Sequence, residues 1–196
     1  RHRLSASVVA EPQPGIDARH KGLIIHRTLA WLWAKLGDQS NLQALDKFER
    51  QRLIRSSITA NFSPMPFETA LERELHFIEC ERLVVLFELW MSQELSRPPF
   101  MVLATERPAT VDFEGLEVGI RVDRIDRLEG GLDVIIDYKT GQCREVDWST
   151  PRLNQPQLPF YALTFPDLQT HGIAFAKVNR TAPGWIDRIV GEEKDE

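Results

Sequence analysis

The spacing of apolar residues changes along the chain and predicts helices in the first half and strands in the second. From Lys21 to Leu36 apolar residues recur with the helical period, and Gly37 then predicts a C-cap. Two further amphipathic helices are predicted over Leu42–Ala60 and Phe67–Leu95, each with charged residues on one side and apolar residues on the other. Residues 1 to about 20 show no period, so we predict an extended entry segment there.

Beyond Arg97 the pattern changes to that of strands. Met101–Thr105 starts the first strand, and Val118–Leu128 alternates polar with apolar residues up to a Glu-Gly-Gly turn. The apolar run Leu132–Tyr138 leaves this turn, so the two runs predict a β-hairpin. Gly172–Val178 is the last core strand that the pattern predicts, and the charged residues after it are expected to fray.

The end of the predicted hairpin brings together side chains that suit metal-dependent hydrolysis. Asp137 and Lys139 are two apart on one strand, so their side chains point the same way. Asp123 lies on the neighbouring strand and reaches the same place. Carboxylates hold a hard divalent cation, and an ammonium group stabilises an anion or orients the attacking water. The alternative is that these are solvated charges at a strand edge, with Asp126 and Arg127 in surface ion pairs.

The whole run from Gly119 to Gly141, GIRVDRIDRLEGGLDVIIDYKTG, resembles the RecB-like branch of the PD-(D/E)XK nuclease superfamily. In that branch a G-x-x-DRID strand is followed by a strand with (I/V)DYKTG. An Asp and a Lys two apart are common by themselves, whereas this longer match fixes the strands, the hairpin and the Gly after Lys-Thr. One departure is Ile120, where the branch usually carries Gly, and it bears on how closely the backbone approaches substrate.

The resemblance implies a fold and a division of the chain. The expected fold class is α/β: a restriction-endonuclease-like mixed central sheet flanked by helices, with an N-terminal helical subdomain. Residues 1–20 would be the entry segment, 21–96 the helical part, 97–180 the nuclease core and 181–196 a charged tail. The implied activity is metal-dependent hydrolysis of DNA phosphodiester bonds in DNA repair or recombination. The implied partners are DNA and a helicase or helicase-like domain of the same protein or complex.

His26 is the residue whose interpretation depends most on the resemblance. It shares a helical face with Leu23, Ala30 and Trp33 and is therefore predicted to point inward, where a single His is more often a core residue than a ligand. The RecB-like branch has a G-x-x-x-H element here, matched by Gly22 and His26, and its His completes the metal site. An imidazole beside carboxylates would favour Mn²⁺ somewhat, relative to an all-oxygen site.

Two further elements of the branch have matches in this chain. The branch places an acidic residue on the first core strand; Glu106 is the best match, although an exposed strand-end charge is an equal interpretation and Glu114 and Glu117 lie nearby. A Q-x-x-x-Y helix follows DYKTG in the branch and packs against the active site, and Gln157 and Tyr161 match it. The alternative is an amphipathic helix whose Gln and Tyr only hydrogen-bond the sheet.

The resemblance also implies a role for each of these residues. The residues implied to bind Mg²⁺ or Mn²⁺ are His26, Glu106, Asp123, Asp137 and the backbone carbonyl of Tyr138. The implied catalytic residues are Asp123, Asp137, Lys139, Gln157 and Tyr161. Lys139 would position the attacking water or offset the charge that develops on the phosphoryl group. Crowded carboxylates are expected to have raised pKa values until the metal binds.

Composition narrows the class of protein further. The net charge of −5 argues mildly against a general nucleic-acid binder. Arginines nevertheless cluster near the hairpin, and the expected DNA contacts are Arg121, Arg124, Arg144 and Arg152. With only two cysteines, Cys80 and Cys143, no iron–sulfur cluster is expected, since the cluster-bearing relatives bind it through four. A reducing cytoplasm is the default compartment, and no apolar run reaches the roughly 20 residues that span a bilayer.

Two rival functions stay open at this stage. One is a DNA-binding module that has the fold but no activity, and the other is an interaction domain that docks onto a helicase or repair partner. The silent module predicts a missing Asp or Lys in the motif, and none is missing. The chain begins at Arg1 without a Met and is expected to be part of a longer protein. Exonuclease cleavage is the expected mode, with polarity and strand preference left open.

Overall fold

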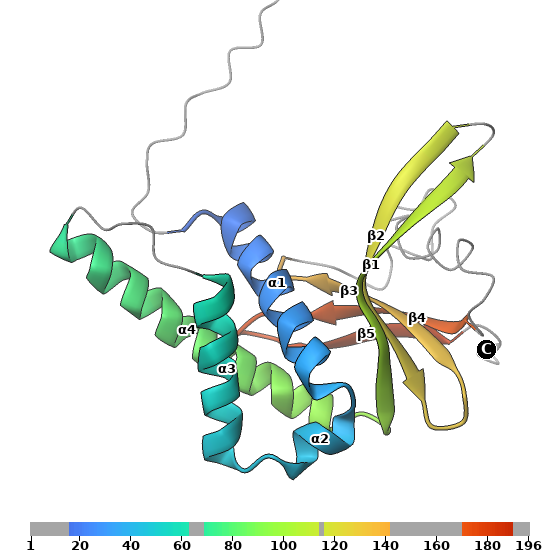
Figure 1. Cartoon of the computed structure of the whole chain (residues 1–196), viewed down its shortest axis with the longest axis horizontal. Coiled ribbons are helices and arrows are strands. Elements are labelled where there is room, and N and C mark those ends of the chain that lie inside the picture. Colours follow the sequence, from blue (N-terminus) through green and yellow to red (C-terminus); the bar gives the residue numbers. More distant parts are fainter. Residues whose placement is uncertain (1–15, 63–68, 114–115, 142–169, 190–196) are drawn as a thin grey trace, which may run out of the picture.

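The computed structural model describes residues 16–62, 69–113, 116–141 and 170–189, which form a helical layer beside a β-sheet (Figure 1). The helices are α1 (Ala18–Leu36), α2 (Gln39–Ala44), α3 (Lys47–Asn61) and α4 (Ala70–Leu95). The strands are β1 (Phe100–Phe113), β2 (Leu116–Leu128), β3 (Asp133–Lys139), β4 (Thr170–Lys177) and β5 (Gly184–Ile189).

Helix α1 begins and ends at caps that the sequence carries. The Asp17 side chain accepts a hydrogen bond from the His20 backbone N–H over 2.8 Å, which satisfies one free donor of the first turn. Gly37 has φ 76, and its N–H donates to the Trp33 carbonyl, which closes the C-terminus. The helix predicted over 21–36 is confirmed, and it begins slightly earlier, at Ala18.

The helix predicted over 42–60 was wrong as a single element. α2 ends at Ala44, Leu45 is extended, and α3 starts after Asp46. The Asp46 carboxylate accepts from the Glu49 backbone N–H, and the Glu49 carboxylate accepts from the Asp46 backbone N–H. This capping box satisfies both groups locally and so begins a new helix. The start predicted at Phe67 lies outside the described residues, while α4 ends at Leu95 as predicted.

The strands form one five-stranded sheet in the order β1-β2-β3-β4-β5. Neighbouring strands are antiparallel except β3 and β4, which run parallel, so the expected mixed sheet is confirmed. The predicted hairpin is also confirmed as β2 and β3. Its turn includes Gly130 and Gly131, whose φ values of 110 and 88 suit residues that have no Cβ.

Strand lengths differ from the prediction at both edges of the sheet. The first strand was expected to end at Glu106, but β1 continues to Phe113 because its pairing with β2 continues. β5 was missed and pairs with β4, so Gly172–Val178 is not the last core strand. β2 pairs with β3 over Arg124–Arg127, and its remainder continues with β1 as a two-stranded arm that projects beyond the sheet (Figure 1).

The apolar core divides between the two faces of the sheet. The larger cluster joins Trp33 of α1 and Trp90 of α4 to Ile136 and Tyr138 of β3. The smaller cluster includes Ile135 of β3, together with Val122, Ile125, Ile173 and Phe175. Ile135 and Ile136 face opposite sides, as neighbours on a strand do, so β3 is covered on both faces.

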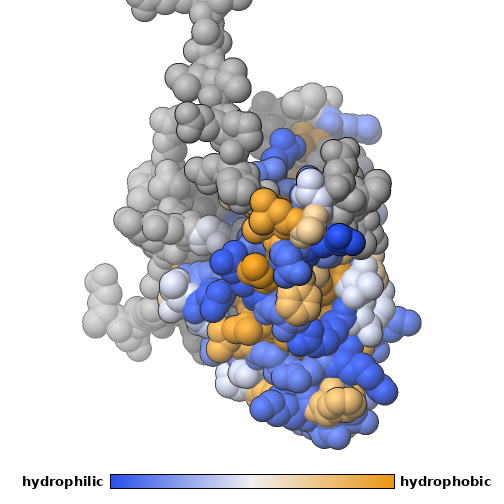
Figure 2. Space-filling view, turned by 90° about the vertical axis from the view of Figure 1, so that its left-hand side faces the viewer, coloured by the Kyte–Doolittle hydropathy of each residue, from blue (hydrophilic) through white to orange (hydrophobic). Residues whose placement is uncertain are grey.

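The helical layer presents some apolar side chains outward (Figure 2). On α4 the side chains of Leu71, Phe77, Ile78 and Val85 are between 43% and 66% exposed. On the face that Figure 2 shows, hydrophobic side chains are scattered among hydrophilic ones. Among the helices that the structure describes, none is both long and apolar enough to cross a membrane.

Candidate active site

Asp123 stands where the ladder between β2 and β3 ends. The last paired residues are Arg124 of β2 and Ile136 of β3. One residue further, the Asp123 carboxylate takes the place of a ladder bond, because its Oδ2 accepts a hydrogen bond from the Tyr138 backbone N–H over 2.7 Å. The Asp123 side chain is 14% exposed, so β3 holds it in place while it still reaches solvent.

Glu106 reaches the same place from β1. The pairs on either side of it in the β1–β2 register place Glu106 opposite Asp123. Glu106 has φ 50, in the left-handed region that residues with a Cβ rarely adopt. Backbone strain of this kind is concentrated at functional sites. The Glu106 carboxylate also lies 3.3 Å from the Arg121 guanidinium, which is 66% exposed.

His26 joins the two acids from helix α1. Its Nδ1 lies 3.3 Å from Asp123 Oδ1, and its ring meets the Tyr138 ring edge-on with centroids 5.8 Å apart. One turn earlier, a Cβ built on Gly22 would lie 3.5 Å from Thr140 Oγ1, so the start of α1 packs close to the end of β3. His26 thus faces the sheet, as its predicted inward orientation requires, although Leu23 of the same predicted face is 47% exposed.

Asp137 and Lys139 form an ion pair beside these three residues. Asp137 Oδ2 and Lys139 Nζ are 2.7 Å apart, and the two side chains are 10% and 21% exposed. Lys139 Nζ also lies 5.2 Å from the centroid of the Phe175 ring. The prediction that Asp137 and Lys139 emerge together at the end of β3 is therefore confirmed.

The site disfavours the charge of Asp137 and favours that of His26. Burial, and then the Asp123 carboxylate, raise the pKa of Asp137 above its usual value against the opposing effects of Lys139 and His26. Burial lowers the pKa of His26, but the hydrogen bond and charge of Asp123, followed by the charges of Asp137 and Glu106, outweigh burial and raise it. The pKa of Asp137 is raised as expected, but burial contributes more to this than the crowding that the prediction relied on.

The donor set fits a hard divalent cation. The ligand atoms of His26, Glu106 and Asp123 all lie within 4.8 Å of one another. Carboxylate oxygens are ligands of Mg²⁺, and an added imidazole suits Mn²⁺ as well. Burial, and then the neighbouring Asp123 carboxylate, raise the pKa of Asp137, so a bound cation would stabilise negative charge that the protein alone leaves unfavourable. Asp137 is not one of the three clustered residues and lies beside them, paired with Lys139.

Arg124 was wrong as a DNA contact. Its side chain is fully buried and pairs with Glu94 and Asp126, so it has no path to a phosphate. The interpretation of Asp126 as a surface charge was wrong for the same reason, since Asp126 is also fully buried. Arg121 is the predicted DNA contact that the structure leaves exposed. Of the remaining predicted residues, Arg144, Arg152, Gln157 and Tyr161 lie outside the described residues.

The sequence patterns missed the buried partners of Arg124. Glu94 is fully buried in the last turn of α4, and Arg97 follows it with a side chain that is 11% exposed. The available signal was an acid on an otherwise apolar helical face, four residues after Trp90 and seven after Phe87. A buried acid on such a face needs a cationic partner.

Comparison with known proteins gives a match to a family model and a similarity to solved structures. The sequence model of the PD-(D/E)XK nuclease superfamily matches residues 1–182. A solved structure titled "Crystal structure of SSO0001" is similar at 14% identity and a TM-score of 0.33, covering 90% of this chain and 80% of that one. No protein with a curated description matches the chain.

Proposed function

The chain belongs to the PD-(D/E)XK nuclease superfamily, and from this membership we propose that it is a metal-dependent DNA nuclease of the RecB-like type. The observation that carries the proposal is the meeting of His26, Glu106 and Asp123 beside the Asp137–Lys139 pair. These residues come from α1, β1, β2 and β3, and their convergence is what the motif order G-x-x-x-H, acid, D and D-x-K predicts.

Each residue then has a task in phosphodiester hydrolysis. His26, Glu106 and Asp123 would hold Mg²⁺ or Mn²⁺, with Asp137 adjacent to the ion. When bound, the ion supplies positive charge for the developing negative charge on the phosphoryl oxygens and makes a coordinated water more acidic. Lys139 holds its ammonium group beside Asp137, where it orients the attacking water or offsets charge on the phosphoryl group.

Binding of DNA is proposed to involve the arm formed by β1 and β2. Arg121 lies on this arm, two residues from Asp123, and its guanidinium is exposed and within reach of Glu106. A phosphate near the metal would compete with Glu106 for this guanidinium, since a guanidinium binds phosphate and carboxylate with the same bidentate geometry. A role in DNA repair beside a helicase-like partner follows from the RecB-like type alone and belongs to the same proposal.

Cleavage of end-labelled DNA tests the proposal directly. Single-stranded and duplex substrates are incubated with the wild type in Mg²⁺, Mn²⁺ or EDTA, and with Asp137→Ala and Lys139→Ala. We expect cutting only with metal, and a loss of at least about 10³-fold in both variants, because each removes a group that acts at the transition state. The product ladder separates exonuclease from endonuclease cleavage.

A matched control, together with the thermal midpoints of all variants, separates loss of chemistry from loss of folding. Arg82→Ala removes an arginine of α4 that is 54% exposed and belongs neither to the ligand cluster nor to the Asp137–Lys139 pair. Its rate should equal that of the wild type. A folded Asp137→Ala protein that cuts at the wild-type rate would show that the assignment is wrong. Binding of DNA by the wild type in EDTA, with no cutting in either metal, would instead support the silent DNA-binding module.

A further inference from the structure

We propose that a buried ion network centred on Arg124 positions the two aspartates of the site. Arg124 follows Asp123 in β2, and its hydroxyl partner Tyr138 follows Asp137 in β3. The network would therefore fix the backbone of each strand at the residue that follows the aspartate. The inference rests on the proposed metal site, and it adds to that site a set of positioning residues that never touch substrate.

The contacts of Arg124 leave it little freedom. Its two terminal nitrogens donate to both carboxylate oxygens of Glu94, over 2.8 and 3.1 Å. Nη2 also donates to Asp126 over 2.7 Å, and Nη1 lies 3.0 Å from the Tyr138 hydroxyl. A planar guanidinium with partners on several sides has a fixed orientation, and a lysine cannot reproduce it.

A second arginine makes the cluster neutral. Arg97 Nη1 donates to Glu94 over 2.9 Å and to Asp126 over 2.7 Å, so two arginines face two carboxylates. Burial raises the pKa of Glu94, but the charges of Arg124 and Arg97 outweigh it and the pKa is lowered, so Glu94 stays ionised. Because buried pairs bring little net stability over an apolar core, a neutral network of this kind is better explained by structural specificity.

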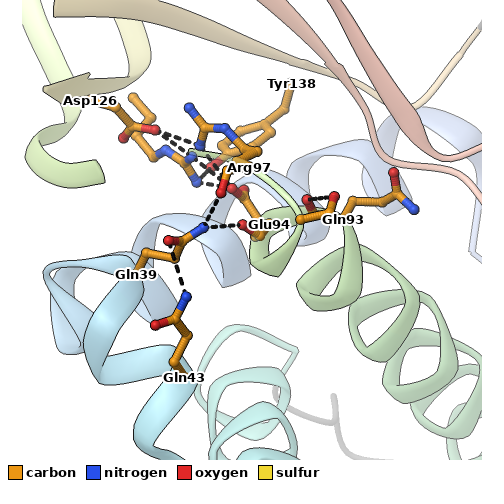
Figure 3. Close-up of polar contacts among 9 residues, drawn as sticks. Gln39, Gln43, Gln93, Glu94, Arg97, Asp126 and Tyr138 are labelled. Carbon is orange, nitrogen blue, oxygen red and sulfur yellow. Dashed lines mark hydrogen bonds and ion pairs between the residues drawn. The ribbon is translucent and has the colours of Figure 1, made fainter. Parts of the chain in front are cut away.

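The network joins the helical layer to the sheet. Glu94 belongs to the last turn of α4, and Gln39 of α2 donates to the backbone carbonyls of Glu94 and Arg97 over 2.8 Å each (Figure 3). The Arg124 guanidinium lies 4.5 Å from the centroid of the Trp33 ring of α1, within reach of a cation–π contact. Three helices therefore fix the orientation of one side chain of β2.

The position of the network along the strands is the decisive point. Ladder pairing between β2 and β3 ends at Arg124 and Ile136, just before the two aspartates. From there on, the two strands are joined by the bond from Arg124 to the Tyr138 hydroxyl and by the bond from the Tyr138 N–H to Asp123. The first of these bonds holds Tyr138, and Tyr138 in turn holds Asp123. Loss of the network should therefore loosen the carboxylates before it unfolds the sheet.

The test uses Tyr138→Phe, which removes only the hydroxyl, and Arg124→Lys, which keeps the positive charge but loses the planar guanidinium with its several N–H donors. The matched control is Arg127→Gln, which breaks a two-bond pair with Asp133 of 2.8 and 3.0 Å between the same strands, at the other end of their ladder. Two quantities are measured at a temperature where all proteins are folded. They are the exchange rate of the backbone amide at position 138 in EDTA and the dissociation constant of Mn²⁺ by calorimetry without DNA.

We expect the amide at position 138 to exchange about tenfold faster in both test variants. The dissociation constant of Mn²⁺ should rise about tenfold, which is at the low end of what is lost when a residue that supports a metal ligand is replaced. Arg127→Gln should change neither quantity. The proposal is overturned if Tyr138→Phe lowers the thermal midpoint and leaves amide exchange and Mn²⁺ binding as in the wild type. A folded wild type that neither binds Mn²⁺ nor cuts DNA would contradict the proposed function instead, and the exchange rates in EDTA would still decide whether the network positions Asp123.

Discussion

Asp137 is the residue at which stability and chemistry oppose each other. Its carboxylate is 10% exposed and lies near Asp123, and both conditions raise its pKa. The pair with Lys139 does not cancel them. The ionised form is thus less favourable in the folded protein than in the unfolded chain, and the contribution of Asp137 to the stability of the metal-free protein falls as pH rises from the ordinary carboxyl pKa to the raised one. An ionised Asp137 therefore destabilises the folded protein until a cation is bound beside it.

We predict that Asp137→Asn raises the thermal midpoint of the metal-free protein and abolishes DNA cleavage. The amide keeps the shape of the side chain and removes its charge, so the gain is absent near the ordinary carboxyl pKa of about 4 and present at pH 7. We expect the thermal midpoint at pH 7 to rise by about 2–4 °C, which corresponds to roughly 1 kcal/mol for a domain of this size. Scanning calorimetry in EDTA at both pH values measures the midpoints.

Asp133→Asn is the matched control for this substitution. Asp133 is also a buried aspartate of β3, but its carboxylate receives two hydrogen bonds from Arg127. Asp133→Asn removes the carboxylate with which Arg127 pairs, so the thermal midpoint should fall at pH 7. If Asp137→Asn lowered the midpoint as Asp133→Asn does, the Asp137 carboxylate would be stabilising and the account of its pKa would be wrong.

Strand β1 is the element whose geometry departs most from an ideal strand. Its register shifts between Val102 and Ala104, and Glu106 has φ 50. Side chains on β2 also change sides here, since Val122 packs in the smaller apolar cluster while Arg124, two residues on, faces Trp33 of the helical layer. The strands bend where the arm leaves the sheet, and the bend directs Glu106 toward Asp123.

The strain at Glu106 is measurable with a pair of substitutions. Glu106→Ala and Glu106→Gly both remove the carboxylate, but only glycine adopts a positive φ without cost. We expect the glycine variant to be more stable than the alanine variant by about 1 kcal/mol in urea unfolding, and both to bind Mn²⁺ more weakly than the wild type. Equal stability of the two variants would mean that the backbone of β1 is not strained at this position.

Local patterns predicted the elements that carry the site, and they failed where a choice depended on other elements. The period of β2 and β3 and the two glycines of their turn predicted the hairpin, and with it the placement of Asp123, Asp137 and Lys139. The break before α3 was missed because the apolar period continues across Asp46, while the capping box overrides it. β5 was missed because its short apolar run is interrupted by charged residues. The strand forms because its backbone pairs with β4, and the local pattern does not show this pairing.

The orientation of Arg124 shows most clearly what a local pattern leaves undecided. Alternation puts Arg124 and Asp126 on one side of β2, but which side is covered depends on where α4 ends. Glu94 lies 30 residues earlier in the sequence and meets Arg124 only when the helical layer packs on the sheet. An arginine in a nuclease motif was therefore interpreted as a DNA contact, whereas the fold uses it as a buried partner.

At the scale of the whole molecule, the candidate site lies between the helical layer and the sheet. His26 comes from α1, while Glu106 and Asp123 come from β1 and β2. Nearby, Lys21 of α1 pairs with Glu79 of α4 at 3.5 Å. A cation held by all three ligands would join the two layers, because it binds the folded arrangement and finds no such set in the unfolded chain.

We predict that Mn²⁺ raises the thermal midpoint of the wild type and that His26→Ala removes most of this effect. At a concentration 100 times the dissociation constant, a ligand specific for the folded state adds about 2.7 kcal/mol. For a domain of this size that is roughly 5–10 °C. His76→Ala is the control, because His76 lies on α4 next to Cys80 and outside the ligand cluster, so its midpoint should rise with Mn²⁺ as in the wild type. The same rise in His26→Ala as in the wild type would show that the cation binds to the sheet alone and that α1 is not part of the metal site.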